Sequence, residues 1–411
     1  MDNIIDISFG SIYVYDFLHA IIAVIFAALM SFVTTPIVRV IAFKIGAVDD
    51  PKRNNRTVHD VPTPRLGGLA VFFSFVISVF LFYGVSKFIL SMIAGASLLI
   101  VVGILDDVFP DKLRAVFKFL VQVAAAGLVV WQGGVLVERI SIFNTYIQFG
   151  IFSIPLTILW IVGLINAINL IDGLDGLSCG ISTISAVSLL IVTILLGEFQ
   201  IALLIAILVG ACVGFLPFNV NPAKIFIGDT GATFLGFVLA VISIQGLFKT
   251  QAVITYIIPF LILGVPIFDT TFVMVRRILS GRHPFSADRG HLHHRLVDMG
   301  FNKKQTVRIL YAVSAMLGIS SVMLVTQKIL YAIIIIAVSL AISVAMWIIF
   351  KDDKMKYESG LMSENGDETK KDDNIKDTEN INTTDVSENK EDKGNIEKTE
   401  KIEKIKSKNK I

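Results

Sequence analysis

Long apolar stretches alternate with short polar segments along the first 350 residues. Several stretches approach the roughly 20 residues with which an α-helix crosses a bilayer. Helices satisfy their backbone over such lengths in lipid, whereas a barrel would show a weaker alternation in segments of about ten residues. We therefore predict an all-α polytopic membrane protein. It should have about eleven spans, near residues 19–41, 67–85, 88–105, 113–131, 151–170, 180–197, 199–217, 232–248, 252–274, 306–326 and 329–350.

The basic residues predict an orientation. If the N-terminus is outside, the loops that follow the odd-numbered spans hold most of the lysines and arginines of residues 1–350, and they face the cytoplasm together with the C-terminus. On the outside, residues 132–150 form the one long loop, and their alternation predicts a short hairpin. The N-terminal segment has no basic region and no cleavage site of small residues, so we expect the first apolar run to be retained.

Composition separates the end of the chain from the rest. The protein is 54% hydrophobic and 17% charged, against about 25% charged in soluble domains. Residues 351–411 are rich in Lys, Glu and Asp and lack an apolar period, so we predict a disordered cytoplasmic tail beside a catalytic domain of residues 1–350. The net charge of +2 is spread over loops, and no nucleic-acid partner is expected. Cys179 and Cys212 are interpreted as buried small hydrophobic residues.

Five polar motifs fall on the loops that this orientation places in the cytoplasm, at residues 46–68, 103–122, 166–177, 218–231 and 276–296. An unpaired charge at the end of an apolar helix is costly, so this concentration predicts a composite site at one membrane face. A secondary transporter is the alternative from a different class. It would place such groups near the middle of the bilayer, often in repeated halves, and the sequence shows no internal repeat.

Two of the motifs contain carboxylates at the ends of apolar runs. Asp106 and Asp107 are adjacent, and like charges at one place need a cation or protonation. Mg²⁺ suits them because it binds oxygen ligands, usually one or two carboxylates with substrate phosphates. The alternative is a cap for the next helix. Asp229 opens a span and is either a ligand or an N-cap; the crowding of Asn219 and Lys224 nearby is not explained by a cap.

A third motif places a polar ridge in an otherwise apolar span. Its polar residues recur at intervals of three: Asn166, Asn169, Asp172 and Asp175. At helical spacing, residues three apart are neighbours on one side, and the glycines within the motif let the backbone approach a ligand. The motif predicts a ridge that faces a substrate, with a helix-packing seam as the alternative.

The last motif contains three histidines, His291, His293 and His294, between Arg289 and Arg295. Clustered histidines suggest Zn²⁺, but no cysteine or carboxylate accompanies them at the usual spacing. The arginines favour an anion site for pyrophosphate, in which the histidines donate hydrogen bonds. No phosphate-binding loop of the Walker type occurs, which argues against a nucleotide-driven pump.

The segments GILDD, NAINLIDGLDGL, FNVNPAKIFIGDTG and DRGHLHHRL closely resemble the motifs of the polyprenyl-phosphate N-acetylhexosamine-1-phosphate transferases. The resemblance covers about residues 20–330, with the motifs in the family's order. This family includes GlcNAc-1-phosphate transferases and the phospho-MurNAc-pentapeptide translocase. The HLHH form is that of the GlcNAc branch, whereas the translocase has three consecutive histidines. UDP-GlcNAc is therefore the favoured donor, and UDP-MurNAc-pentapeptide or another UDP-HexNAc is the alternative.

The resemblance also implies residue roles. It makes Asp229 the main Mg²⁺ ligand, with Asp106 and Asp107 near the metal, and Mn²⁺ as a substitute ion. It implies catalytic roles for Asp106, Asp107, Asp172, Lys118 and His291. It implies substrate-binding roles for Asn169, Asp175, Asn219, Phe226, Arg289, His293 and His294. One departure is Pro110, which stands where many relatives have a third acid, so Asp111 is left outside the site.

The implied reaction joins two anions. The acceptor is an undecaprenyl or other polyprenyl phosphate, a monoester whose second pKa is about 6, so a strong base is not required. We favour direct in-line attack on the sugar-linked phosphorus with release of UMP; an aspartyl-phosphate on Asp106 or Asp107 is the alternative. The implied setting is the cytoplasmic face of the plasma membrane, at the first membrane step of envelope glycopolymer synthesis. A homodimer is compatible with these expectations.

Overall fold

The computed structural model describes residues 2–49, 62–109, 112–142, 145–247, 253–281 and 290–341. In these ranges seven helices are long and apolar enough to cross a membrane, which agrees with the predicted all-α polytopic membrane protein. They are α1 (Asp2–Ile45, apolar from Phe17), α3 (Lys87–Val108), α5 (Ser153–Ile171), α6 (Leu177–Leu195), α7 (Phe199–Asn219), α8 (Gly228–Leu247) and α12 (Lys303–Val325).

Three further apolar helices are shorter. These are Gly67–Tyr83, which consists of α2 (Gly67–Ser78) and the π-helical turn η1 (Val79–Tyr83), α4 (Ala115–Trp131) and the helix Ile329–Ala341. Each coincides with a predicted span. The number of spans and their orientation stay predictions of the hydropathy and of the basic residues.

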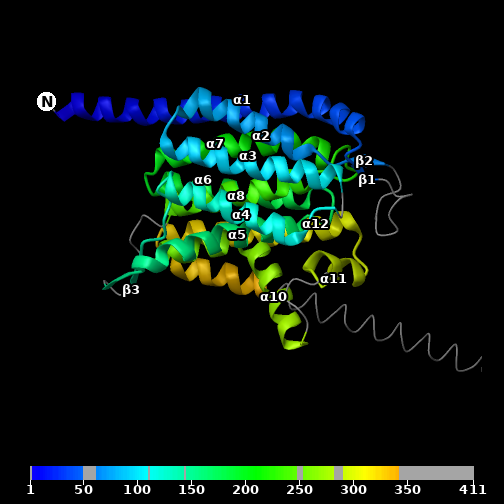
Figure 1. The fold of residues 1–411 in the computed structure, drawn as a ribbon. Helices are drawn as coiled ribbons and strands as arrows, with labels where there is room; N and C mark the ends of the chain where they lie inside the picture. Colours follow the sequence, from blue (N-terminus) through cyan, green and yellow to red (C-terminus); the bar gives the residue numbers. More distant parts are fainter. Residues whose placement is uncertain are drawn as a thin grey trace, which may run out of the picture. The chain divides into compact units, whose positions relative to one another are not determined.

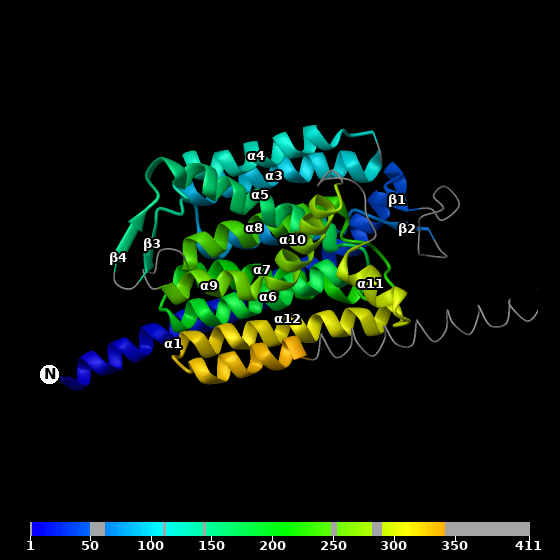
Figure 2. The ribbon, with the colours of Figure 1, turned by 90° about the horizontal axis from the view of Figure 1, so that it is seen from below.

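Helix α8 lies in the middle of the bundle (Figures 1 and 2). Its apolar window is completely buried, and it packs against α2, α3, α5 and α6. A helix that is hydrophobic on all sides belongs in a core. Its first turn is approached by two glycines: a Cβ on Gly68 would collide with the backbone of Gly231, and one on Gly103 with the backbone of Thr230. Small residues permit this close packing, which places the start of α8 between α2 and α3.

The predicted single span 252–274 is wrong. The structure has two helices there, α9 (Val253–Ile262) and α10 (Gly264–Leu279). Pro266 explains the break, because proline has no N–H for the carbonyl four residues earlier and its ring crowds that carbonyl. The carbonyl in question, on Ile262, accepts a hydrogen bond from Ser185 Oγ at 2.9 Å instead.

Helix α10 diverges from the other helices (Figure 1) and is amphipathic. Phe268, Phe272 and Leu279 are exposed on one side, whereas Asp269 and Arg277 are buried on the other. The exposed side is apolar and suits lipid. The buried side brings a carboxylate and a guanidinium toward the bundle.

Two short hairpins and a short helix complete the described chain. The predicted hairpin in residues 132–150 is confirmed: β3 (Arg139–Ile142) pairs antiparallel with β4 (Thr145–Gln148). At the opposite end of the bundle lie α11 (Leu292–Asp298) and the pair of β1 (Val48–Asp49) and β2 (Thr63–Pro64) (Figure 2). The 3-10 turn η2 (Gly150–Phe152) precedes α5. The predicted tail, residues 351–411, lies outside the described residues.

Candidate active site

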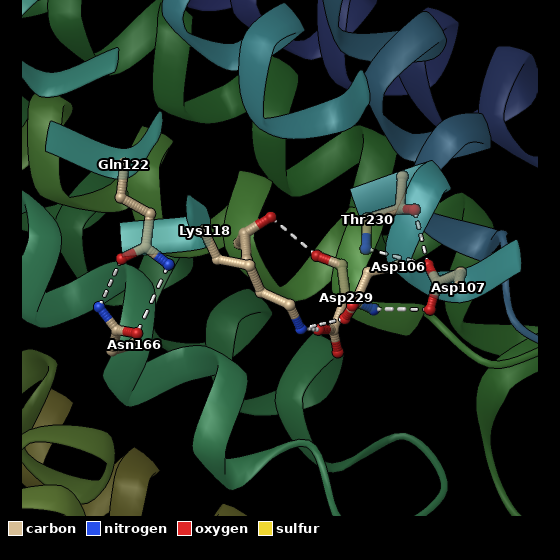
Figure 3. Close-up of polar contacts among 8 residues, drawn as sticks. Asp106, Asp107, Lys118, Gln122, Asn166, Asp229 and Thr230 are labelled. Atoms are coloured by element: carbon tan, nitrogen blue, oxygen red, sulfur yellow. Dashed lines mark hydrogen bonds and ion pairs between the residues drawn. The ribbon is translucent and has the colours of Figure 1, made fainter. Parts of the chain in front are cut away.

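The end of the bundle that contains β1, β2 and α11 also contains the polar ends of α3, α5, α7 and α8 and the first turn of α4. Described residues from each of the five predicted motifs therefore meet at one end. At the centre, Lys118 of α4 lies between Asp106, in the last turn of α3, and Asp229, in the first turn of α8 (Figure 3). Its Nζ forms an ion pair with Asp106 and lies 3.3 Å from Oδ2 of Asp229.

The two carboxylates that face Lys118 are partly open to solvent. The side chain of Asp106 is 12% exposed and that of Asp229 is 33% exposed. They also lie within hydrogen-bonding reach of each other. Two acids in contact carry a repulsion that one ammonium group only partly offsets, and this arrangement attracts a further cation.

Asp107 points away from this pair and is buried. Its Oδ1 accepts a hydrogen bond from the N–H of Asp229 at 3.2 Å, and its Oδ2 accepts from the N–H and the hydroxyl of Thr230 at 3.1 and 2.6 Å. The first N–H groups of a helix lack partners within the helix, so Asp107 of α3 caps α8 across the interface (Figure 3).

The sequence left two capping roles open: Asp106 or Asp107 as a cap of the next helix, and Asp229 as the N-cap of its own helix. Asp229 contributes to the start of α8 by its backbone, while its carboxylate faces Lys118. Neither acid of the Asp106–Asp107 pair caps α4, whose N-cap residue, Arg114, makes no side-chain capping bond. Gly228 has a φ of +70°, and a Cβ there would collide with the carbonyl of Arg65. Only glycine fits this approach to α8 without strain.

Asp172 directly follows α5 and accepts a hydrogen bond from Ser178 Oγ at 2.6 Å. Burial raises its pKa to about 7, and the negative charge of Asp229 acts in the same direction, although the Ser178 hydrogen bond opposes it. One turn earlier, Asn169 lies within hydrogen-bonding reach of Asp229. Asp172 can therefore hold or release a proton near neutral pH, close to the carboxylate pair.

The polar ridge of residues 166–177 divides between two roles. Asn169 and Asp172 lie at the centre, whereas the side-chain amide of Asn166 pairs with that of Gln122 on α4, at 2.7 and 3.4 Å (Figure 3). Asn166 thus ties α5 to α4, as the packing-seam alternative expects, and the other residues of the ridge lie at the site.

Asp175 and Asn219 shape the loop that leads into α8. Asp175 Oδ2 accepts hydrogen bonds from Asn221 Nδ2 at 2.9 Å and from the N–H of Ala223 at 3.0 Å. Asn219 donates to the carbonyl of Ile225 at 3.0 Å. Its Oδ1 is buried, with no hydrogen-bond partner in the described part of the chain. Phe226 is partly buried and its backbone pairs with Pro64 and Gly67.

The histidines lie on and just before α11. His293 is 1% exposed, and neither ring nitrogen has a hydrogen-bond partner in the described ranges. Its ring lies against the backbone of Gly173, where a Cβ would collide with it. Burial lowers the pKa of His293 to about 4, with contributions from His294 and His291 that Asp269 opposes. His293 is therefore neutral at pH 7. Arg289 lies outside the described residues.

Two charged residues lie in this region although the sequence analysis does not assign them to the site. Arg65, in the 46–68 motif, forms an ion pair with Asp49 at 2.7 Å. Burial acts against its charge, but Asp49, Asp107 and Asp229 raise its pKa. Asp269 of α10 contacts His291, with 2.9 Å between Oδ2 and Nδ1. Asp269 could have been recognised in the sequence as a lone acid in an apolar run. Such an acid is costly in a membrane unless it has a partner, so it indicates a contact with another polar group.

The carboxylates of this site fit a hard divalent cation whose coordination shell is completed by oxygen atoms of a substrate. Within the described residues no three His, Cys, Asp or Glu side chains are arranged to hold a metal on their own. Asp106 and Asp229 supply two carboxylates in contact, and Mg²⁺ usually binds one or two carboxylates together with phosphate oxygens and water.

Comparison with known proteins agrees with the motifs. Residues 89–247 match glycosyl transferase family 4. The chain is 40% identical over 324 residues to a probable undecaprenyl-phosphate N-acetylglucosaminyl 1-phosphate transferase of Bacillus subtilis, covering 78% of this chain and 88% of that protein.

Two more distant relatives have similar names. The chain is 31% identical to a decaprenyl-phosphate N-acetylglucosaminephosphotransferase of Mycolicibacterium smegmatis, over 69% of this chain and 77% of that protein. It is 30% identical to an undecaprenyl-phosphate alpha-N-acetylglucosaminyl 1-phosphate transferase of Thermotoga maritima, over 71% and 87%. The structure brings Asp106, Lys118 and Asp229 together as an acid–lysine centre. The chain belongs to glycosyl transferase family 4, the polyprenyl-phosphate N-acetylhexosamine-1-phosphate transferases.

Proposed function

We propose that the protein transfers N-acetylglucosamine-1-phosphate from UDP-GlcNAc to a polyprenyl phosphate and releases UMP. The observation that carries this proposal is Lys118, held between Asp106 and Asp229 at the ends of three apolar helices. A lipid phosphate and a water-soluble nucleotide can both reach such a place, at the boundary between membrane and water. The names of the relatives support the same substrates.

Asp106 and Asp229 would hold Mg²⁺, or Mn²⁺ in its place. When bound, the ion supplies positive charge that offsets the repulsion between donor and acceptor phosphates. Asp107 is the third predicted ligand. Its three hydrogen bonds to the start of α8 support an indirect role, in which it holds Asp229 in place.

The acceptor needs little activation, because a phosphate monoester is largely a dianion at neutral pH. In the proposed step, a bond forms between an oxygen of the lipid phosphate and the sugar-linked phosphorus. The bond from that phosphorus to the bridging oxygen breaks, and UMP leaves with the electron pair. Lys118 and Arg65 neutralise charge on the phosphates, and His291 donates a hydrogen bond to the leaving group.

Direct displacement is favoured over an aspartyl-phosphate. Asp107 uses both oxygens as acceptors for the start of α8, and Asp106 is paired with Lys118. A carboxylate nucleophile needs a free lone pair aimed at phosphorus, so these contacts make Asp107 a poor nucleophile, while Asp106 would be engaged by Lys118 and the proposed cation.

The basic loops support a location in the cell membrane with the site on the cytoplasmic side. The resemblance to the transferase family supports a further part of the proposal, that this reaction is the first membrane step in the synthesis of an envelope glycopolymer.

Purified protein with Mg²⁺, undecaprenyl phosphate and UDP-GlcNAc tests the function. We expect equal amounts of UMP and lipid-linked GlcNAc diphosphate, and no product when UDP-MurNAc-pentapeptide is the donor. Turnover of the pentapeptide donor alone would move the protein to the translocase branch. Absence of UMP with either donor, in protein that is folded and monodisperse, would reject the transferase.

A further inference from the structure

Asp269 is a buried carboxylate that the acid–lysine centre does not use. We propose that Asp269 is a positioning residue: it orients His291, so that a defined ring nitrogen faces the substrate phosphates. This inference rests on the proposed function, because it assigns His291 its task in that reaction.

The geometry gives Asp269 two partners on residues 290–294, the histidine segment. Its side chain is 2% exposed, and its Oδ2 lies 2.9 Å from Nδ1 of His291. Its Oδ1 accepts a hydrogen bond at 2.6 Å from the N–H of Leu292, the first residue of α11. One carboxylate therefore fixes both the start of the short helix and the rotation of the imidazole ring.

Helix α10 also contacts the segment just before His291. A Cβ on Gly290 would collide with the guanidinium of Arg276, so this arginine lies against the backbone there. Asp269 and Arg276 are seven residues apart and lie on the same side of a helix, two turns from each other. The buried side of α10 thus supports the histidine segment at two points.

The pair has a chemical consequence for the ring. An ionised carboxylate can only accept hydrogen bonds, so Nδ1 of His291 carries the proton in this contact. Nε2 is then the atom left for the substrate. When the ring donates from Nε2 to a phosphate, it is charged, and Asp269 balances that charge. Carboxylates that orient a histidine in this way are familiar from catalytic sites.

A purely structural role for Asp269 would not require this second contact. Any neutral acceptor could satisfy the N–H of Leu292, as Asn or Ser does at an N-cap. Burying an ionised carboxylate is costly without a partner, and the imidazole supplies one. His293, two residues away, makes no such hydrogen bond: in the described ranges both of its ring nitrogens lack a hydrogen-bond partner.

Asp269→Asn tests the proposal with little change of shape. The amide oxygen still accepts from Leu292, but the amide group that replaces Oδ2 cannot accept from Nδ1. We expect kcat for UMP release to fall at least about 10-fold, the lower end of the losses seen when a carboxylate that orients a histidine is removed, while KM for UDP-GlcNAc changes less than about threefold. Asp269→Glu, which keeps the carboxylate, should recover part of the loss.

A double-mutant comparison separates positioning from folding. If Asp269 acts through His291, Asp269→Asn should cost less than about twofold when it is added to His291→Gln, because residues that act as a unit are not additive. Losses that multiply, or a single Asp269→Asn variant with wild-type kcat, would overturn the proposal. Thr270→Val is the matched control: it changes the next residue of α10, whose hydroxyl has no hydrogen-bond partner in the described chain, and it should leave kcat unchanged.

A spectroscopic measurement covers the case in which Asp269→Asn does not fold. In an NMR spectrum of wild-type protein labelled with ¹⁵N-histidine, the signals of His291 are identified as those that disappear in His291→Gln. We expect these signals to show a proton on Nδ1. A proton on Nε2 alone would reject the proposal. This result is independent of turnover, so wild-type protein that releases no UMP would count against the proposed function and not against the Asp269–His291 contact.

Discussion

The acid–lysine centre and the histidine segment are held in place by different means. The start of α8 is fixed by backbone packing, with Gly68 and Gly103 in direct contact with its first turn and Asp107 as its cap. His291 precedes a helix of seven residues and, within the described ranges, its imidazole contacts one carboxylate, that of Asp269 on the separate helix α10. Packed backbones cannot shift without displacing whole helices, whereas a side-chain contact can be lost by one substitution. The first region therefore depends on many residues, and the second depends strongly on Asp269.

The largest effect in this comparison should come from Asp229→Asn. We expect UMP release to fall at least about 10²-fold, because a carboxylate that faces Lys118 and the proposed cation is lost. Folding should be retained, since Asp107 and not the Asp229 side chain caps α8. UMP assays and thermal melting measure the two quantities. Asp298→Asn, an exposed acid at the end of α11, is the control. Near-normal turnover of Asp229→Asn would remove Asp229 from the site.

A smaller effect is expected from Gly103→Ala, which tests backbone packing directly. The added methyl group would collide with Thr230, so α3 and α8 must separate. We expect a loss of about 1–3 kcal/mol in the free energy of unfolding, typical of overpacking, together with lower kcat because Asp106 and Asp229 move apart. Gly127→Ala is the matched control, since a Cβ there meets no atom within 4 Å and alanine favours a helix by up to about 1 kcal/mol. Equal stabilities of the two variants would contradict the packing argument.

The difference in pH dependence of stability between wild type and His293→Gln isolates the histidine segment, because Asp172, whose pKa burial raises to about 7, titrates in the same pH window in both proteins. The pKa of His293 is lowered from 6.5 to about 4 in the folded protein, so the unfolded chain binds the proton first as the pH falls. His293 thus contributes stability that is complete above about pH 6.5 and is lost as the pH drops toward 4. Melting temperatures across this window should fall less steeply in His293→Gln than in wild type. Parallel curves would show that His293 does not titrate in the folded state as described.

The smallest effect is expected outside both regions. Deleting residues 355–411 should leave kcat in detergent nearly unchanged, because a charged segment without apolar period contributes no core. UMP release per milligram of monodisperse truncated protein measures this. A large loss would assign the tail a part in the site that its composition does not indicate.

Several features of the fold could be predicted because they depend on local sequence. Apolar length predicts a helix in lipid whatever surrounds it, so the long helices and the hairpin of residues 139–148 follow from the pattern. The sequence pattern does not predict the break between α9 and α10, although it contains Pro266. Proline within an apolar run is compatible with a continuous helix where neighbours satisfy the freed carbonyl. Here that neighbour is Ser185, which no local pattern pairs with Ile262.

By itself, the sequence determined the class of protein, the family and the motifs whose described residues meet at one end of the bundle. Helix lengths and motif order are local properties, and they need no knowledge of neighbours. Only the tertiary structure decided how two adjacent acids divide their tasks: Asp106 faces Lys118, while Asp107 caps α8, more than a hundred residues away. It also paired Asp269 with His291. The orientation of a side chain at a helix end depends on the donors that another helix presents there, and those donors are set by packing.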